Sequence, residues 1–429
     1  MPESIKVGII GFGIVGAGTY RALTRNADSI ARRAGAPVVV TKIADVDWTR
    51  ERDIAVPEEI RTTDAMALVS DPNIDIVVET IGGVKPALDF VLAAIAHGKS
   101  VVTSNKELIA RHGHEILARA EEQGVDVEFE GAVGGVIPII RSLKESLEAD
   151  RVVEIMGIVN GTTNYILTRM SQEGLDFATA LAEAQALGYA EADPTNDVEG
   201  YDARYKIAIL AASAFGLKVQ LDDIYAEGIT QVTPHDIAYA KTMGYVIKLL
   251  AIARRGDGDR IEARVHPVML RDSHPLAAVN GVFNAIFVRG EGCDDVMLYG
   301  RGAGGHPTGV AVAGDVLDCA RNRLHQASGR VLCTCEAPAQ VMPMADVQTK
   351  SYLRMRVKDR PGVLGSIATI FGTEGVSIAS VHQSATDGQV AEIVWVTHKN
   401  PESQLQSALG AISRLAIVEE IPATLRVED

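Results

Sequence analysis

The sequence predicts an α/β protein that begins with a doubly wound parallel sheet and ends with a βαββαβ unit. Two observations support this fold class. Short β-branched runs alternate with helical stretches over residues 5–130, and strand and helix patterns follow one another in βαββαβ order over residues 351–429. Regular alternation of strand and helix is typical of a parallel sheet with helices on both faces. A chain of 429 residues is also too long for one ordinary core, so two or three domains are expected.

The first domain is expected over residues 1–130, completed by a helical segment near residues 305–330. Its strand-like runs are, in order, IKVGII, VVVTKIAD, IDIVVETI, SVVTSN and VDVEFE. Each is short, rich in β-branched residues and followed by a helical stretch, as parallel βαβ units require.

The middle of the chain, residues 131–335, is expected to form an α+β catalytic and oligomerisation domain. It contains the strand-like run VVEIMGIV and helical patterns over residues 176–187, 197–215 and 235–254. Residues 336–350 hold two prolines and little periodicity, which predicts a linker. Residues 351–429 then form the ferredoxin-like βαββαβ domain.

Composition excludes several classes of protein. The formal charge is −15, and lysines and arginines are dispersed among a larger number of acids, which argues against nucleic acid and anionic membranes as partners. Hydrophobic residues make up 47% of the chain and charged residues 23%, as in a folded globular protein. No signal peptide or membrane-spanning run is expected. The cysteines show no disulfide framework or metal-ligand spacing, so we expect reduced thiols and a cytoplasmic location; they are Cys293, Cys319, Cys333 and Cys335.

A glycine-rich turn follows the first strand, in the stretch VGIIGFGIVGAGTY. Gly11, Gly13 and Gly16 stand where a Rossmann-like fold needs a tight turn, room for a pyrophosphate and close helix packing, with Phe12 and Val15 between them. The helix that begins here would offer backbone amides to the phosphates. We therefore expect a dinucleotide site.

The cofactor preference stays open in the sequence. Asp45 follows the second strand and could accept the hydroxyls of an adenine ribose, which would favour NAD. Arg50 lies close enough to favour the 2′-phosphate of NADP instead. An alternative is that Asp45 only starts a turn.

An acidic stretch, GYAEADPTNDVEGYDARYK, ends at Lys206 and precedes the run IAILAASAFGL. A helix that is apolar on every side for this length must pass through a core, so Lys206 is expected where a helix enters the interior. Asp202 lies one turn earlier on the same face. A solvated surface pair is the alternative, worth only ~0.3–0.5 kcal/mol.

The chain resembles the homoserine dehydrogenase family in its monofunctional form with a C-terminal ACT domain. The resemblance covers essentially the whole length. Its motifs are GFGIVG (11–16), TSNKELIA (103–110), EGAVGGVIPII (130–140), GIVNGTTNYIL (157–167), GYAEADPTNDVEGYDARYK (188–206) and GRGAGGHPTGVAVAGDVLD (300–318).

The resemblance implies NAD(P)-dependent interconversion of L-aspartate 4-semialdehyde and L-homoserine, a step toward threonine, methionine and isoleucine. Reduction of an aldehyde leaves an alkoxide, so the site needs an acid or cation beside that oxygen. A buried ammonium at Lys206 meets this need, and desolvation would lower its pKa. Asp202 would orient it, and Lys106 would support polarisation.

The same resemblance implies roles for further residues. Glu191 would hold the substrate ammonium group, with Asp202 in the substrate shell, and the turn Asn160, Gly161, Thr162 would receive the carboxylate. The neighbouring acids Asp193, Asp197 and Glu199 are expected only to cap and solvate the helix start. Expected cofactor contacts beyond the glycine turn are Thr103, Lys106, Gly188 and Gly302. Expected ligands of a sodium ion are Glu130, Val133, Gly135 and Ile137.

The last domain resembles an ACT domain through DRPGVLGSIATIFGTEGVSIASV, residues 359–381. Such domains commonly bind amino acids between two copies, so we expect feedback by threonine at the turn from Asp359 to Gly362. An assembly role is the alternative. A homodimer or homotetramer is expected.

Two other functions fit these residues less well. Other ACT-bearing dehydrogenases, acting on 3-phosphoglycerate or prephenate, use histidine as acid or base, and the histidines here stand in no comparable pattern. A non-catalytic sensor of dinucleotide and amino acid would not need Glu191, Asp202 and Lys206 at this spacing. The sequence therefore favours an enzyme.

Overall fold

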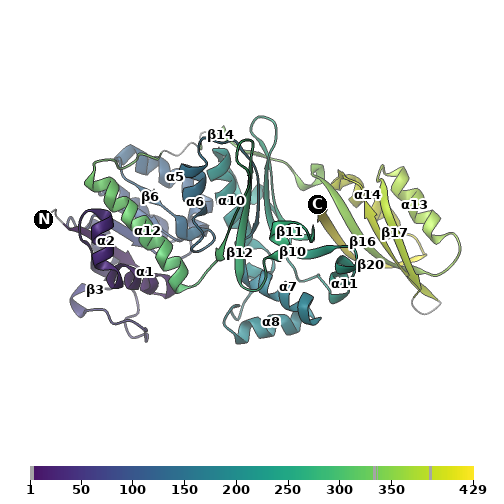
Figure 1. Ribbon diagram of the computed structural model, residues 1–429, viewed down its shortest axis with the longest axis horizontal. Helices are drawn as coiled ribbons and strands as arrows, with labels where there is room; N and C mark the ends of the chain where they lie inside the picture. The colour runs from purple at the N-terminus through teal and green to yellow at the C-terminus, as the bar shows by residue number, and fades with distance from the viewer. Residues whose placement is uncertain (1–3, 332–334, 336, 386–388) are drawn as a thin grey trace. The chain divides into compact units, whose positions relative to one another are not determined.

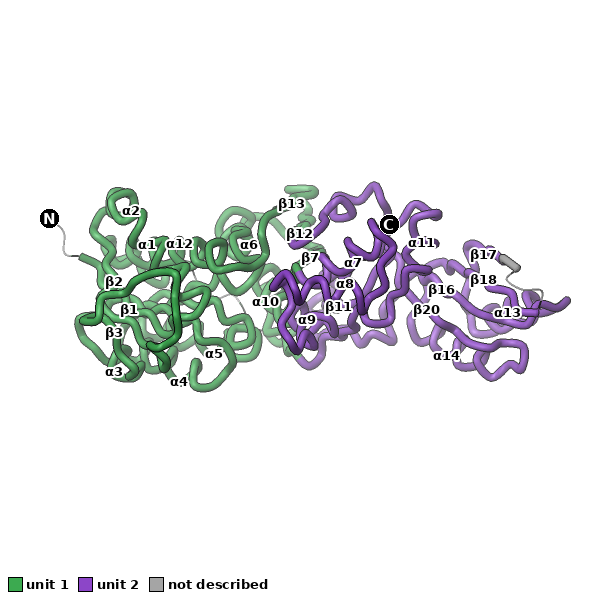
Figure 2. Tube along the Cα trace, turned by 90° about the horizontal axis from the view of Figure 1, so that it is seen from below, with its two compact units in different colours: residues 1–161, 205–221, 283–339 green, residues 162–204, 222–282, 340–429 purple. Residues whose placement is uncertain are grey.

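The computed structural model describes residues 4–331, 335, 337–385 and 389–429. The chain forms two compact units (Figure 2). Unit 1 comprises Met1–Gly161, Tyr205–Leu221 and Phe283–Ala339, and unit 2 comprises Thr162–Arg204, Asp222–Val282 and Gln340–Asp429. The backbone thus passes between the units several times.

Unit 1 is built on a six-stranded sheet in the order β3-β2-β1-β4-β5-β6, in which all neighbouring strands run parallel. The strands are β1 (Ile5–Ile10), β2 (Val38–Ala44), β3 (Arg61–Thr62), β4 (Ile76–Glu79), β5 (Ser100–Thr103) and β6 (Val127–Glu128). The strand order reverses between β1 and β4. Ligands of such sheets bind outside the carboxyl ends of the strands at this point. The predicted doubly wound sheet is confirmed.

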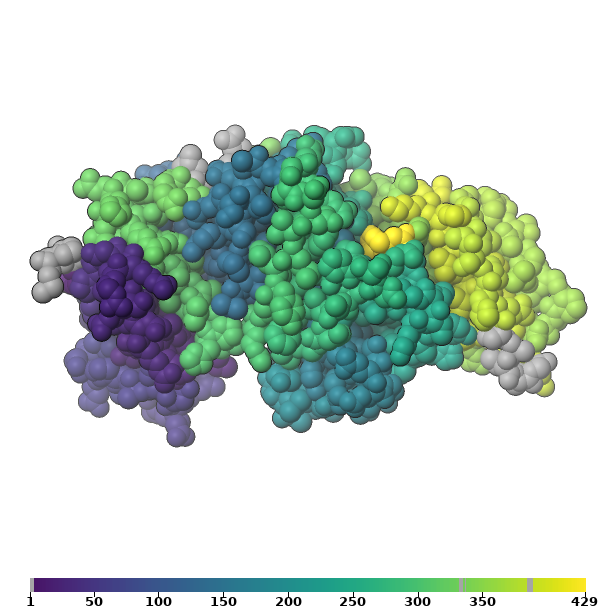
Figure 3. Space-filling view, viewed as in Figure 1, coloured from purple at the N-terminus to yellow at the C-terminus, as the bar shows by residue number. Residues whose placement is uncertain are grey.

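Helices cover this sheet (Figure 1). They are α1 (Ile14–Arg25), α2 (Ala27–Ala34), α3 (Ala65–Ser70), α4 (Ala87–Ala96), α5 (Lys106–Gln123) and α12 (Gly305–Leu324). Although α12 is far away in sequence, its residues lie directly against the N-terminal helices (Figure 3). The approach depends on small residues, because a β-carbon at Gly309 would collide with the backbone of Gly18.

The remainder of unit 1 contains three antiparallel strands, with β12 between β7 and β13. They are β7 (Val152–Ile158), β12 (Phe283–Gly290) and β13 (Asp294–Arg301). A short parallel pair joins β8 (Leu217–Lys218) to β14 (Ala337–Pro338). Short helical turns include α6 (Ile139–Arg141). Helix α10 (Tyr201–Phe215) begins in unit 2 and continues into unit 1.

Unit 2 contains a mixed sheet in the order β10-β11-β20-β16-β18-β17. Its main strands are β10 (Tyr245–Arg255), β11 (Arg260–Arg271), β16 (Gln348–Lys358), β17 (Ile378–Ala385), β18 (Val390–Thr397) and β20 (Val418–Glu428). Short strands β9 (Tyr225–Ala226) and β15 (Gln340–Val341) also pair with β11, and β19 (Asn400–Pro401) pairs with β16. The helices are α7 (Gly161–Glu173), α8 (Phe177–Ala186), α9 (Thr195–Val198), α11 (Pro234–Thr242), α13 (Val363–Thr373) and α14 (Glu402–Ile412).

The C-terminal part of unit 2 follows the order β16-α13-β17-β18-α14-β20, apart from the short β19, which confirms the predicted βαββαβ unit. Its core contains Phe371 of α13 and Trp395 of β18, whose ring centroids lie 5.3 Å apart. Aromatic pairs of this kind stabilise a core beyond their buried area. The expected linker region, 336–350, carries β14, β15 and the start of β16.

The helix expected over residues 235–254 is wrong. The pattern over residues 235–254 predicts a single helix, but α11 ends at Thr242 and β10 begins at Tyr245. Gly244 lies between them with φ +79, a conformation that ends a helix at little cost. The apolar run of β10 is buried along its centre and pairs with β11 over its whole length. A continuous apolar run of this kind fits a buried strand as well as a buried helix, so periodicity could not separate them.

Within the described residues, no helix is long and apolar enough to cross a membrane. Cys293, Cys319 and Cys335 are free thiols, whereas Cys333 lies outside the described residues.

Candidate active site

A cleft of about 560 Å³ opens at the carboxyl ends of β1, β2 and β4 in unit 1. Its walls are largely apolar, and Val46 is 92% exposed there. Exposed apolar side chains that line a concave site suit a flat ring such as adenine. Its lining residues are Ile10, Gly11, Ala44, Asp45, Val46, Thr63, Asp64, Ala65, Met66, Ile81, Gly82, Pro86 and Phe90.

The glycine turn lies beside this cleft. Gly11 has φ +89, which a residue with a side chain rarely adopts. Nothing lies within 4 Å of the position that a β-carbon would take on Gly13, so a ligand can approach the backbone closely. Gly13 also precedes α1 and provides no side-chain cap, which leaves the first-turn amides suited to a phosphate. These residues fit a dinucleotide.

Asp45 lines the cleft, but its carboxylate is already engaged. One oxygen accepts from the Phe12 amide at 2.6 Å, and the other accepts from the Asp47 amide at 2.9 Å. Arg52 pairs with the same carboxylate at 3.2 Å, and its guanidinium lies over the rings of Phe12 and Trp48. Asp45 therefore ties the glycine turn to the segment after β2. The ribose role stays a prediction.

The end of β5 and the start of α5 carry the next predicted residues. Thr103 ends β5, and Lys106 is the first residue of α5. Asn105 caps this helix by accepting from the Leu108 amide at 3.1 Å, and its side-chain amide donates to the Gly83 carbonyl at 2.6 Å. Lys106 is thereby placed at the carboxyl edge of the sheet. The sequence interpretation missed Asn105, although an Asn directly before a helix is a common cap.

Lys206 is buried in unit 1, with 7% of its surface exposed. Its Nζ donates to the Val159 carbonyl at 2.6 Å, directly before the predicted turn at Asn160 and Gly161. The preceding residue, Tyr205, donates its hydroxyl to Glu107 at 3.3 Å, next to Lys106 in the chain. Tyr205 and Glu107, which adjoin Lys206 and Lys106 in the chain, thus join α10 to α5. The expected burial of Lys206 is confirmed.

The other expected substrate residues lie in unit 2. Asp202 is 2% exposed and stands one turn before Lys206 in α10, whereas Glu191 is exposed in the segment between α8 and α9. Thr162 donates its hydroxyl to the Tyr189 carbonyl at 2.7 Å, next to Gly188. The start of α7 and the segment that carries Gly188 and Glu191 are therefore joined.

The loop expected to hold sodium is ordered by the Glu130 side chain. Its carboxylate accepts from the amides of Ile140 and Arg141 at 2.8 and 2.9 Å, while its own amide donates to Asp315 at 2.9 Å. Burial raises the pKa of Glu130, and it raises the pKa of Asp315 well above its usual value. Because the carboxylate already caps α6, Glu130 can offer a cation its backbone carbonyl.

The rest of this loop offers backbone groups. The Gly134 carbonyl accepts from the Ile137 amide at 3.0 Å, and Gly135 lies against Gly302, where a β-carbon would meet the Gly302 carbonyl. Among the residues that the structure describes, no group of three or more His, Cys, Asp or Glu could hold a metal ion. Any cation here would depend on the carbonyls of Glu130, Val133, Gly135 and Ile137.

The predicted effector turn lies before α13. The Asp359 amide donates to the Gln389 carbonyl at 2.8 Å, and Gly362 precedes the helix with φ +90. Nothing lies within 4 Å of a β-carbon position on Gly362. The turn is therefore open to a small molecule.

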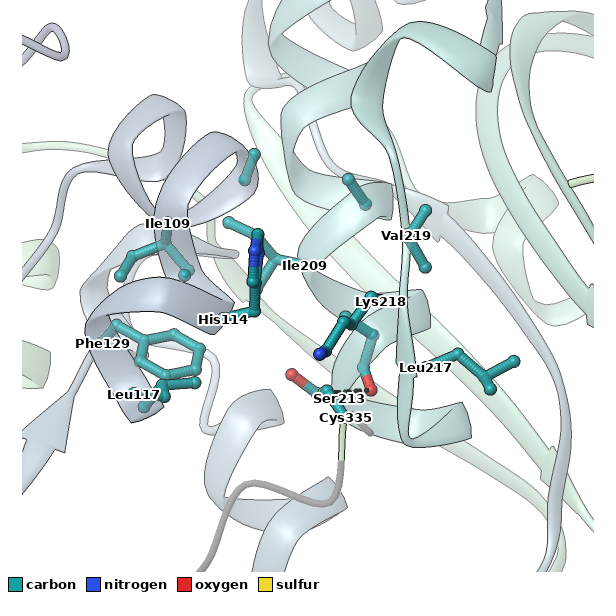
Figure 4. Close-up of a pocket in the computed structure, with 14 residues that line it drawn as sticks. Ile109, His114, Leu117, Phe129, Ile209, Ser213, Leu217, Lys218, Val219 and Cys335 are labelled. Carbon is teal, nitrogen blue, oxygen red and sulfur yellow. Dashed lines mark hydrogen bonds between the residues drawn. The ribbon is translucent and has the colours of Figure 1, made fainter. Parts of the chain in front are cut away.

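A second pocket in unit 1, of about 60 Å³, lies between α5 and α10 (Figure 4). His114 and Ser213 line it among apolar side chains such as Ile209, and the Cys335 thiol contacts the Ala212 carbonyl. It is far too small for a dinucleotide. The cleft at the glycine turn is the cofactor candidate.

The fold and the cleft define a dinucleotide-dependent oxidoreductase with a C-terminal ACT domain. Family models match at residues 11–130 (homoserine dehydrogenase, NAD binding domain), 138–317 (homoserine dehydrogenase) and 351–416 (ACT domain). The chain belongs to the homoserine dehydrogenase family. The resemblance seen in the sequence motifs is confirmed, as is the class of enzyme, an NAD(P)-dependent oxidoreductase.

Relatives match over nearly the whole chain. The homoserine dehydrogenase of Bacillus subtilis is 41% identical and that of Synechocystis 46% identical, each over 99% of both chains. A crystal structure of a homoserine dehydrogenase from Thiobacillus denitrificans is 43% identical with a TM-score of 0.94, covering 100% of this chain and 99% of that one. A hyperthermophilic archaeal homoserine dehydrogenase mutant, solved in complex with NADPH, is 28% identical with a TM-score of 0.63 and covers 74% of this chain and 98% of that one.

Proposed function

We propose that the protein interconverts L-aspartate 4-semialdehyde and L-homoserine, with Lys206 as the proton donor to the new alcohol. The observation that carries this role is the buried amine of Lys206, held by the Val159 carbonyl beside Asn160 and Gly161. A bound reduced dinucleotide supplies the hydride that adds to the aldehyde carbon. The carbonyl oxygen then gains negative charge, and a proton on the Lys206 amine neutralises it.

Further residues have supporting roles in this proposal. Asp202, one turn before Lys206, orients the amine and keeps it charged. Lys106, at the first turn of α5, polarises the aldehyde. Burial supports the roles of Lys206 and Asp202, because both side chains are almost inaccessible to water. An interaction between charges is stronger where water is excluded.

The substrate is held by its charged ends. Glu191 binds the ammonium group, and the turn of Asn160, Gly161 and Thr162 receives the carboxylate at the start of α7. The hydrogen bond from Thr162 to the Tyr189 carbonyl supports this arrangement. It fixes Thr162, a proposed contact of the substrate carboxylate, near the segment that bears Glu191.

The cofactor is NAD or NADP. It lies against the glycine turn of Gly11, Phe12, Gly13, Val15 and Gly16. The other proposed contacts are Asp45, Thr103, Lys106, Gly188 and Gly302. The engagement of Asp45 by Arg52 supports use of both dinucleotides, since a partly neutralised carboxylate repels a 2′-phosphate less.

The proposal has four further parts. They are a sodium ion in the 130–137 loop, threonine as effector, a homodimer or homotetramer, and a cytoplasmic location. The sodium ligands are the carbonyls of Glu130, Val133, Gly135 and Ile137. The effector site is the turn from Asp359 to Gly362, whose open backbone supports it. The free thiols support a reducing compartment.

One assay tests the reaction. Purified protein is mixed with L-aspartate 4-semialdehyde and each reduced dinucleotide, and oxidation of the dinucleotide is followed by its absorbance. We expect oxidation with at least one of them and reduction of the oxidised form with L-homoserine. Binding of dinucleotide without turnover in either direction would favour a sensing role instead.

A further inference from the structure

The buried carboxylate of Glu79 lies at the carboxyl end of β4 and has no place in the reaction derived above. Its side chain is 0% exposed, and the residue pairs with Ile10 of β1 on one side and Thr103 of β5 on the other. Glu79 therefore lies at the carboxyl end of a central strand, next to the point where the strand order reverses. A buried carboxylate at such an edge needs partners, because burial without them is costly.

The partners of Glu79 come from the loop after β4 and from the end of β5. One carboxylate oxygen accepts from the Ile81 amide at 2.7 Å and from the Gly82 amide at 3.4 Å. The other accepts from the Thr103 hydroxyl at 2.7 Å. One side chain thus joins the loop after β4 to the end of β5.

The hydrogen-bond directions are fixed by the neighbours of Thr103. The Asn105 amide donates to the Thr103 hydroxyl oxygen at 3.0 Å, so the hydroxyl hydrogen is left to point at Glu79. The Asn105 side chain then reaches back to the Gly83 carbonyl at 2.6 Å. The loop 80–83 and the segment 103–105 are closed into one network, directly before Lys106 in the chain.

The Ile81 amide, the Gly82 amide and the Thr103 hydroxyl donate to Glu79, so both oxygens of its ionised form have hydrogen-bond donors. Among the residues that the structure describes, the groups that affect the pKa of Glu79 most are hydrogen-bond donors, and none of them is a lysine or arginine. Burial raises the pKa of Glu79, whereas the hydrogen bonds from Thr103, Ile81 and Gly82 oppose this shift because they stabilise the ionised carboxylate. A cation that arrived near this edge would stabilise the ionised form further.

The cofactor can bring that charge. With the pyrophosphate at the glycine turn after β1, the adenosine half of a bound dinucleotide would lie on the β2 side of this turn and the nicotinamide half on the β4 and β5 side. The nicotinamide ring carries a positive charge only when it is oxidised. A fixed negative charge beneath it would favour the oxidised form over the reduced form.

We propose that Glu79 is a positioning residue for the nicotinamide half of the cofactor: it holds the loop that carries Gly82 and the end of β5 at Thr103 in place, and its negative charge favours binding of the oxidised dinucleotide. This inference rests on the proposed dehydrogenase function for its effect on turnover. Its effect on binding requires only the dinucleotide and is measured without substrate.

The test compares dissociation constants of oxidised and reduced dinucleotide for wild type and Glu79→Gln, by calorimetric titration. The substitution keeps the shape and removes the charge. We expect the affinity for the oxidised form, relative to the reduced form, to fall roughly tenfold. This is the effect of removing one of two opposite charges about 10 Å apart at an effective dielectric constant of about 20. An unchanged ratio would overturn the charge role.

Asp126→Asn is the matched control. Asp126 is also buried, and its carboxylate also accepts from a loop amide, that of Gly329 at 2.8 Å. It differs in position, because it directly precedes β6 and so lies at the amino ends of the strands of the same sheet. We expect this variant to lose stability while it keeps the wild-type ratio of affinities. If the ratio of affinities changes equally in both variants, the change reflects a general loss of structural order in the sheet. That result would contradict the proposal.

Two further variants separate charge from position and remain informative if Glu79→Gln does not fold. Glu79→Asp keeps the charge and shortens the reach, so we expect a wild-type affinity ratio with lowered kcat. Thr103→Val removes the hydroxyl link while Glu79 stays charged, so kcat should fall with the ratio kept. Wild-type kcat in both variants would overturn the positioning role.

Discussion

The hydroxyl of Tyr205 donates to the carboxylate of Glu107 at 3.3 Å. These residues directly adjoin Lys206 and Lys106 in the chain, so this hydrogen bond joins the helices that carry both proposed catalytic lysines. Neither residue needs to touch the substrate to affect the reaction, because catalysis depends on how accurately the reacting groups are held.

Replacement of Tyr205 by phenylalanine should therefore lower kcat with little change in the KM for dinucleotide. Loss of one such bond should cost about 0.5–1.5 kcal/mol of stability. Steady-state kinetics and thermal unfolding measure the two effects. Tyr245→Phe is the control, since it loses a comparable bond to Asp429, at 3.1 Å, in unit 2. It should lose similar or less stability and keep kcat; an equal loss of kcat in both would contradict a specific role for Tyr205.

Lys206→Ala should reduce turnover by roughly 100- to 10,000-fold, the range typical of a lost general acid. Dinucleotide affinity should stay near wild type, because the glycine turn is untouched. Rapid-mixing kinetics and a binding titration test both parts. Lys218→Ala removes a half-buried lysine elsewhere in unit 1 and should keep turnover. Near-normal turnover in the Lys206 variant would remove the proton-donor role.

Asp45→Ala should raise the KM for NADH and for NADPH together. The reason is that Asp45 holds the Phe12 amide in the glycine turn and is paired with Arg52. Loss of a ribose contact alone would weaken NADH and spare or improve NADPH. Comparison of kcat/KM for the two cofactors in both proteins distinguishes these outcomes.

Lys248 gives the protein a pH-dependent term in stability. It is buried in β10, where its Nζ donates to the Val279 carbonyl at 2.5 Å and to the side-chain oxygens of Asn164 and Asn280 at 3.2 and 3.1 Å. Burial lowers its pKa from 10.5 to about 8. Between these values the unfolded chain binds more protons than the folded chain, so the contribution of Lys248 to stability rises with pH across this window.

The expected gain is about 3 kcal/mol between pH 8 and pH 10.5, from a shift of about 2.5 pKa units. Chemical denaturation of wild type and Lys248→Met at several pH values measures it, and the difference between the two proteins cancels other titrating groups. A difference that stays flat across this range would show that Lys248 keeps its usual pKa in the folded protein.

Threonine should lower the reaction rate and raise the melting temperature, because a ligand that binds only the folded state stabilises it. Asp359→Ala should increase the threonine concentration required for both effects. Asp257→Ala, an exposed acid in the turn between β10 and β11, is the control and should respond as wild type does. If threonine changes neither rate nor melting temperature, it is not the effector.

Several features were predictable from local pattern. The parallel sheet follows from alternating runs, the dinucleotide turn from glycine spacing after a strand, and the entry of Lys206 into a core from the apolar run that follows it. Each depends on residues close together in the chain. The helix expected over residues 235–254 failed because a buried strand and a buried helix can share one continuous apolar run.

The sequence alone determined the family, the fold class and the residue types available for hydride-transfer chemistry. Only the tertiary structure decided which of them are engaged: Asp45 with Phe12 and Arg52, Glu130 with the start of α6, and Glu79 with the loops after β4 and β5. The physical reason is that hydrogen-bond partners and burial depend on segments far apart in the chain, whereas periodicity and motif spacing report only near neighbours.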